Sequence, residues 1–269
     1  MNTETECSRL LAPVGHTVAA ISDGSDTLTA RLFMALPMTV HKHAAGDVLL
    51  GGEEDTVVIA QSGTAVSRDI LSDGKRLVSD FAYSGNIFGS GSVLFSQLGR
   101  QIVAVKAGTH LRISGSELRR FIAQKPDMGN ALATLAQLEE MAYRNRMLLV
   151  ARADPLARIS NFLLELFGRV RHASSYHNGR LASSRIVPFP YGQGVVADIV
   201  GLSSVHVSRT LTALTKSGDI ARPARHLIDV LDEKKLLSRT GLEDVAFFSR
   251  TAKPMLTHLR ASEGRSNDR

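Results

Sequence analysis

Residues 195–214 constrain the fold more than any other stretch, because they have the pattern of two short helices that cross at a tight turn. The crossing requires a small side chain on the first helix, and Ala197 provides it. The turn requires a residue that adopts a left-handed backbone conformation at little cost, as Gly201 does. Leu202 fills the corner, and the hydroxyl of Ser203 is placed to cap the second helix. The stretch Val195–Leu214 therefore predicts a helix-turn-helix.

The second of these helices has an unusual outer face. Its period directs Val207, Leu211 and Leu214 inward. A solvated face normally carries Lys and Glu, but here the outward side chains are short, with a single arginine: Ser204, Val205, Ser208, Arg209 and Thr212. Short side chains let a helix enter a DNA major groove about 12 Å wide, where an arginine binds guanine or a phosphate. Each residue alone is compatible with an ordinary helix surface, and the combination favours DNA binding.

The net charge of +6 lies in the C-terminal half of the chain. Residues 154–269 contain 17 Lys and Arg against 11 Asp and Glu, whereas residues 1–153 contain 15 of each. This asymmetry is typical of a protein that binds a polyanion. A solubilising surface with a basic tail would give the same count, so charge alone does not decide.

Two further strands are expected after the helix-turn-helix. Ile220–Arg222 and His226–Val230 flank Pro223-Ala224-Arg225 and predict a β-wing with Arg222 and Arg225 near its tip. Two arginines at a tip favour contact with phosphates. The alternative is a hairpin that only covers the helix-turn-helix core.

The N-terminal half has a different residue pattern. Residues 1–25 predict a partly disordered leader without the pattern of a signal peptide, and Thr27–Ala35 predicts a short helix. Residues 26–125 predict a small β domain, in which Ser72-Asp73-Gly74 indicates a tight hairpin turn. The expected strands are β-rich runs between glycines, namely Val48–Leu50, Val57–Ala60, Leu77–Phe81, Ile102–Val105 and Leu111–Ile113.

Helices are expected to follow this β domain. Ser116–Gln124 predicts a short one, and residues 126–152 predict a long one with a coiled-coil seam: Met128, Leu132, Leu135, Leu138, Ala142, Asn145 and Leu149. This seam fits either a helix that packs on its own β domain or, as we favour, a dimerisation helix. Asp154 and Pro155 begin the next helix, which extends to Gly168. Arg171–Arg185 predicts a loop, residues 153–237 the C-terminal domain, and residues 238–269 an extension with a helix near Val245–Arg250.

Gly201–Leu214 and the wing resemble the Crp/Fnr superfamily of bacterial transcription regulators. The resemblance extends over about Leu32–Leu237 and includes glycine motifs such as Ala45–Leu49, Gln61–Gly63, Asp73–Arg76 and Ser84–Gly89, and the helix Arg158–Leu166. It implies an α+β fold: an N-terminal β-roll (jelly-roll-like) of the cyclic-nucleotide-binding type, a long dimerisation helix and a C-terminal winged helix-turn-helix.

The resemblance also implies a function. A homodimer would bind double-stranded DNA at a palindromic operator, with RNA polymerase as a further partner. The DNA-binding residues would be Ser204, Val205, His206, Ser208, Arg209, Thr212, Arg222 and Arg225. Val205 stands where the family commonly has a glutamate, so a different half-site is expected, in which Val205 touches a thymine methyl group. His206 fits either a phosphate contact or a plain surface position.

The effector motifs depart from the family's pattern. Ser90 follows Phe88-Gly89 where cyclic-nucleotide binders have a glutamate, and Gln101 follows Arg100 where they have a hydroxyl residue, so cyclic AMP is not expected. The lone Cys7 excludes a four-cysteine iron–sulfur cluster within the chain. His41, His43 and His110 leave haem open, although scattered histidines are more often surface residues. No other metal or cofactor is predicted.

Other function classes receive less support. Gly89-Ser90-Gly91 is better explained as a β-roll turn than as a nucleophile motif, so we expect no enzyme. No stretch has the roughly 20 apolar residues of a membrane helix, and a cytoplasmic protein is expected. The main alternative to a DNA-binding regulator is a module that senses a small effector and signals through a protein partner.

Overall fold

A computed structural model of the chain describes residues 36–51, 54–74, 76–89, 100–124, 126–152, 154–174 and 185–245. The predicted leader, the Thr27–Ala35 helix, Cys7 and the chain beyond Val245 lie outside the described residues. The same holds for the side chains of Met128 and Leu135 in the long helix.

The N-terminal domain is built from two four-stranded antiparallel sheets. One has the order β1-β8-β3-β6, with β1 Thr39–His43, β8 Gly108–Ser114, β3 Thr56–Ala60 and β6 Ile87–Phe88. The other has the order β2-β7-β4-β5, with β2 Val48–Leu50, β7 Arg100–Lys106, β4 Thr64–Ile70 and β5 Arg76–Ala82. The five expected strands are present, in most cases longer than predicted, and β1, β4 and β6 are additional.

The hairpin β4–β5 differs from the tight turn predicted at Asp73-Gly74. Its register pairs Ile70 with Arg76, so the connection is longer than two residues. The N–H of Gly74 donates to the carbonyl of Leu71 at 2.8 Å, and Gly74 has φ +78°. Asp73 and Gly74 therefore occupy the last two positions of a four-residue turn, and only the positive φ at Gly74 was foreseen.

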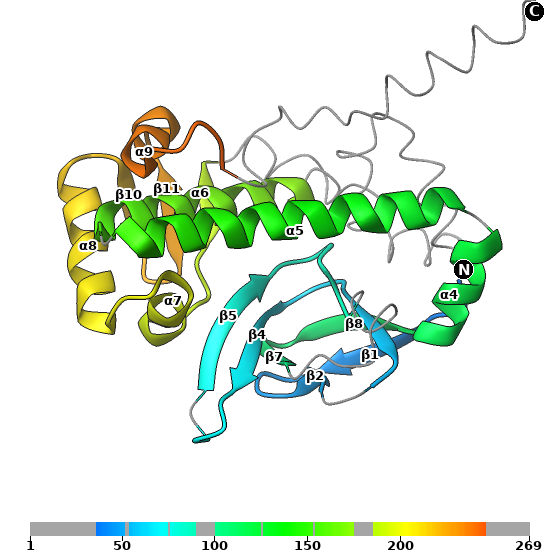
Figure 1. Cartoon of the computed structure of the whole chain (residues 1–269). Helices are drawn as coiled ribbons and strands as arrows, with labels where there is room; N and C mark the ends of the chain where they lie inside the picture. Colours follow the sequence, from blue (N-terminus) through cyan, green and yellow to red (C-terminus); the bar gives the residue numbers. More distant parts are fainter. Residues whose placement is uncertain are drawn as a thin grey trace, which may run out of the picture.

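Three helices follow the sheets: α4 Gly115–Gln124, α5 Pro126–Arg152 and α6 Pro155–Ser174. The long α5 runs beside the sheets and reaches the C-terminal domain (Figure 1). The predicted loop at Arg171 is wrong for its first residues, because α6 continues through them. Val170 is buried there, and the guanidinium of Arg171 lies 3.9 Å from the ring centroid of Phe167.

The described side chains of the predicted seam of α5 have contacts within the same chain. Ala142 and Leu149 are 1% and 3% exposed, and Leu132 and Leu138 pack against the core of the β domain. The side-chain amide of Asn145 donates to the backbone carbonyl of Asp244 at 3.4 Å. In this conformation Ala142 and Leu149 offer no surface to a partner. The exposed apolar residues of α5 are not members of the seam and include Met141, Met147, Leu148 and Val150, of which Met141 and Leu148 lie on one side of the helix.

The C-terminal domain combines helices with a small antiparallel sheet of order β10-β11-β9. Its elements are β9 Ile186–Pro188, α7 Gln193–Val200, α8 Ser204–Lys216, β10 Ile220–Ala224, β11 Leu227–Val230 and α9 Glu233–Thr240. The wing is present, but Ala224 pairs with Leu227, so its tip is Arg225-His226 rather than Pro223–Arg225. Strand β9 and helix α9 were not predicted.

The two domains share one hydrophobic core. Phe81 of β5 packs edge-on against Phe162 of α6 with ring centroids 5.0 Å apart. The hydroxyl of Tyr83 donates to the carbonyl of Pro188 at 2.8 Å, and that of Tyr191 to the carbonyl of Ala82 at 3.1 Å. Strand β5 of the N-terminal domain thus packs directly against the C-terminal domain.

Candidate nucleic-acid interface

The helix-turn-helix forms as its residue pattern predicts. Helix α7 ends at Gly201, which adopts the left-handed conformation with φ +64°. Ser203 caps α8, since its Oγ accepts a hydrogen bond from the backbone N–H of His206 at 3.3 Å. Val207, Leu211 and Leu214 are buried, which fixes the rotation of α8 about its axis. Thr210 is also buried, a position that the sequence pattern did not single out.

This rotation leaves the outer face of α8 uncovered. Val205 is 58% exposed, and Ser204, Arg209 and Thr212 are also exposed, while Ser208 is partly exposed. Ser208, Arg209, Thr212, Ala213 and Lys216 line an open hollow. The hydroxyl of Thr212 donates to the carbonyl of Ser208 at 3.0 Å, which holds the side chain close to its own helix. The side chains of this face therefore project little from the helix and are accessible, as entry into a groove requires.

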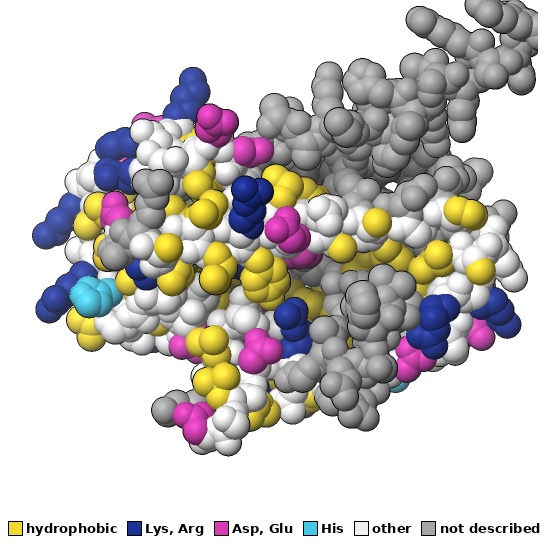
Figure 2. Space-filling model, in the orientation of Figure 1, with side chains coloured by type: hydrophobic (Ala, Val, Ile, Leu, Met, Phe, Trp, Pro, Cys, Tyr) yellow, Lys and Arg dark blue, Asp and Glu magenta, His cyan; other side chains and the backbone are white. Residues whose placement is uncertain are grey.

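Positive charge gathers around this face. Lys and Arg side chains are concentrated at the end of the molecule that carries α8 and the wing (Figure 2). Within the described part of the chain, neither Arg209 nor Arg225 forms an ion pair. Binding of an anionic ligand by these guanidinium groups therefore does not require an existing ion pair to break. Arg225 is exposed at the wing tip, and Arg222 is partly buried. His206 is exposed, with its Nδ1 3.0 Å from Ser203 Oγ.

A buried carboxylate supports α8 from behind. Asp219 follows α8 and is fully buried, with Lys235 Nζ 2.6 Å from Oδ1 and Arg239 Nε 2.5 Å from Oδ2. Burial alone would raise the pKa of Asp219, but the hydrogen bonds from Lys235 and Arg239 outweigh it and lower the pKa. The ion pairs tie the end of α8 to α9. Sequence reasoning missed them, because nothing local relates Asp219 to residues 16 and more positions away.

A second buried network lies where β5, α5 and α6 meet. We call Asp80, Glu139, Arg146, Glu165 and Arg169 the interdomain charge cluster. Arg169 contacts Glu139 at 2.6 Å and Glu165 at 2.9 Å, while Arg146 contacts Glu165 at 3.0 Å and Asp80 at 3.1 Å. Three carboxylates therefore face two arginines. Burial raises the pKa of Glu139, and so do the charges of Asp80 and Glu165, while Arg169 opposes the rise.

The three histidines of the β domain prove to be neighbours, not scattered residues. Strand pairing sets His41 opposite His110, and the Nδ1 atoms of His43 and His110 are 3.1 Å apart. Burial first, and then the nearby charges of His43 and His41, lower the pKa of His110 to about 4. One of the two Nδ1 atoms carries the proton and donates it to the other, which accepts. No group of three or more His, Cys, Asp or Glu residues in the described ranges is arranged to hold a metal ion.

The residues of the expected effector region have partners within the chain. Arg100 Nη1 donates to the hydroxyl of Tyr143 at 3.4 Å, and Arg68 Nη2 donates to Gln101 Oε1 at 2.6 Å. Ser90 and Gly91 lie outside the described residues. Among the helices that are described, none is both long and apolar enough to cross a membrane.

Comparisons with known proteins agree with this architecture. A family model described as the Crp-like helix-turn-helix domain matches residues 157–239. The nitrogen fixation regulation protein FixK of Bradyrhizobium diazoefficiens is 28% identical over 224 residues, which are 79% of this chain and 89% of that protein. FixK of Azorhizobium caulinodans is 28% identical over 184 residues, which are 68% and 70% of the two chains.

Solved structures show the same fold. FixK2 from Bradyrhizobium japonicum superposes with a TM-score of 0.68 at 21% identity and covers 78% of this chain and 100% of that one. A CooA variant from Carboxydothermus hydrogenoformans gives a TM-score of 0.55 at 16% identity, over 76% and 88% of the two chains.

Fold and site together define a protein in which one long helix joins an N-terminal β-roll to a C-terminal winged helix-turn-helix domain. Its residues 157–239 match the Crp-like helix-turn-helix, and its relatives over most of the chain are regulators. These findings support a DNA-binding transcription regulator of the Crp/Fnr type.

Proposed function

We propose that the chain acts as a homodimer on a palindromic operator, with one α8 in each of two successive major grooves. The observation that carries this proposal is the exposed face of α8 with short side chains, where Arg209 forms no ion pair with any described residue. Ser204, Val205, Ser208, Arg209 and Thr212 would contact base edges. His206, Arg222 and Arg225 would contact phosphates, which supply affinity and set the register.

The proposed dimer contact is the exposed apolar face of α5. Met141 and Leu148 are seven residues apart, so they lie on one side of the helix, and both are exposed. Of the predicted seam residues, Leu132, Leu138 and Asn145 have contacts within the chain, and Ala142 and Leu149 are buried. Two-fold symmetry of the dimer would match the symmetry of a palindrome whose half-sites are about one helical turn apart.

Regulation is proposed to proceed without cyclic AMP. A ribose-binding carboxylate and a phosphate-binding hydroxyl are replaced by Ser90 and Gln101, and the Gln101 side chain already accepts from Arg68. We further propose that the chain is a regulator rather than an enzyme and that RNA polymerase is the partner through which it acts.

The test starts with selection of bound duplexes from random DNA by the full chain. On the selected duplex, Arg209→Ala should weaken specific binding by about 1–3 kcal/mol, because it removes a bidentate contact to guanine. Arg120→Ala is the matched control, since it removes one exposed positive charge from α4, at the far end of the molecule. Selection of no common sequence, or equal binding by Arg209→Ala and the wild type, would contradict the proposal.

A further inference from the structure

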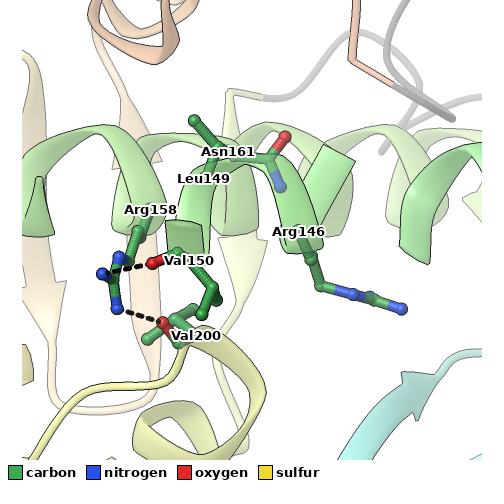
Figure 3. A pocket seen from close by; sticks show the side chains of 6 residues that line it. All are labelled: Arg146, Leu149, Val150, Arg158, Asn161 and Val200. Carbon is green, nitrogen blue, oxygen red and sulfur yellow. Dashed lines mark hydrogen bonds between the residues drawn. The ribbon is translucent and has the colours of Figure 1, made fainter. Parts of the chain in front are cut away.

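One arginine ties the end of α5 to the turn of the helix-turn-helix. Arg158 lies in the first turn of α6, where its backbone N–H donates to the carbonyl of Asp154 at 3.2 Å. Its Nη2 donates to the carbonyl of Val150 at 2.9 Å. Its Nη1 donates to the carbonyl of Gly201 at 2.7 Å and to that of Val200 at 3.3 Å. Figure 3 shows the side chain of Arg158 between α5 and the end of α7.

We call the contact of Arg158 with the C-terminal ends of α5 and α7 the joint. Its electrostatics favour a fixed geometry. Val150 belongs to the last turn of α5, and Val200 and Gly201 end α7. Carbonyls at a helix C-terminus lack intrahelical partners and carry partial negative charge. Arg158 is 8% exposed, and in the described ranges no carboxylate forms an ion pair with it. A buried cation that moved away from these carbonyls would lose its compensation.

The backbone at Gly201 lies close to both α5 and Arg158, although a small pocket beside it is lined by Val150, Arg158 and Val200. A Cβ atom built at Gly201 would lie 3.3 Å from Val150 Cγ2 and 3.4 Å from Arg158 Nη1. Helix α5 therefore touches the turn directly, and Arg158 holds the two together by hydrogen bonds. Gly201 is needed here for this close approach as well as for its positive φ.

A small rotation at the joint would move the far end of α8 by about the distance between neighbouring base pairs. Helix α8 begins at Ser204, three residues after Gly201, and its 13 residues span about 20 Å. A rotation of about 10° at the joint would displace the far end by about 3.5 Å. One base-pair step is about 3.4 Å. The orientation of α8 relative to α5 therefore sets the separation of half-sites that a dimer can bind.

We propose that Arg158 is a positioning residue that sets this orientation, and with it the half-site spacing that the dimer accepts. It touches no DNA and acts through Val150, Val200 and Gly201. The inference rests on the proposed homodimer on a palindrome.

The experiment uses the palindrome selected by the wild-type chain. Duplexes carry its two half-sites at the selected spacing and at spacings shorter or longer by one and two base pairs, and one duplex carries a single half-site. Binding is measured for the wild type, Arg158→Met and Arg158→Lys. Arg171→Met is the matched control, because it removes a guanidinium from the same helix that contacts Glu233 of α9 instead of the joint. Thermal unfolding and sedimentation report stability and dimerisation.

We expect Arg158→Met to bind the single half-site within about twofold of the wild type and to lose tenfold or more on the selected palindrome. Its preference among spacings should flatten or shift by a base pair. Arg158→Lys should restore part of the preference, and Arg171→Met should keep all of it. If Arg158→Met does not fold, the spacing profile of Arg158→Lys decides, and an unchanged profile overturns the inference.

Two other results would also overturn it. In the first, Arg158→Met keeps the spacing preference and the palindrome affinity. In the second, it loses half-site and palindrome binding equally, in step with its thermal stability, as expected of a residue that only stabilises the fold. If the wild type itself selects no palindrome, the proposed function fails and this inference fails with it. A wild-type palindrome with an unchanged Arg158→Met profile refutes the inference alone.

Discussion

Replacing Arg169 with methionine tests the interdomain charge cluster. The side chain of Arg169 is 2% exposed and donates to Glu139 from Nη1 and Nη2 at 3.0 and 2.6 Å and to Glu165 from Nε at 3.0 Å. Without it, the buried carboxylates of Asp80 and Glu165 and the partly exposed one of Glu139 face Arg146 alone. Breaking a buried ion network by removing one partner costs about 3–5 kcal/mol, because a charge is left uncompensated. We expect Arg169→Met to lower the free energy of unfolding by about this amount at pH 7.5.

The same reasoning fixes the pH dependence. The pKa of Glu139 is already raised in the wild type, and loss of the opposing charge of Arg169 should raise it further, so the folded state of Arg169→Met binds more protons than the unfolded state. Stability then increases as the pH falls, and the deficit should shrink between pH 7.5 and pH 5.5.

Urea denaturation at the two pH values measures this deficit. Asp80→Asn is the control, because it leaves two carboxylates facing two arginines and should cost about 1 kcal/mol or less. A loss below about 1 kcal/mol for Arg169→Met, or a loss independent of pH, would refute the electrostatic account.

Three further predictions concern the cap, the histidines and the dimer. Ser203→Ala should lower the free energy of unfolding by about 1 kcal/mol, and Ser203→Asp should retain most of it, as urea denaturation would show. Because the pKa of His110 is lowered to about 4, stability should fall as the pH drops from about 6.5 toward 4. His110→Gln should remove about 1–2 kcal/mol of that loss by pH 5, and an unchanged pH profile would count against it. Leu148→Glu should convert dimers to monomers in sedimentation, whereas Val40→Glu, equally exposed on β1, should not.

The helix-turn-helix was predictable because its determinants are local. Ala197, Gly201 and Ser203 act within a few residues of their own positions, and the structure shows the left-handed turn and the cap where the pattern puts them. The glycine-bounded strands were predictable for the same reason. Strand β4 follows Gly63 directly but was missed, because the sequence Thr64–Ile70 mixes apolar, polar and charged residues without a clear alternation.

Features that depend on distant partners were not predictable. The period of α5 identified an apolar face but not its partner, and Ala142 and Leu149 turn out to pack within the chain. The contacts of Arg158 join residues 8 and 43 positions apart, and the interdomain charge cluster joins three separate elements. No local pattern relates such residues, so only the assembled fold brings them together.

The most direct test of the central claim is methylation interference at guanine N7 on the selected duplex. N7 lies in the major groove, where α8 is proposed to read bases. The account predicts interference in two blocks about 10 base pairs apart, with one guanine in each block losing its effect in Arg209→Ala. Interference that is absent from the major groove, or identical in Arg209→Ala and the wild type, would contradict it.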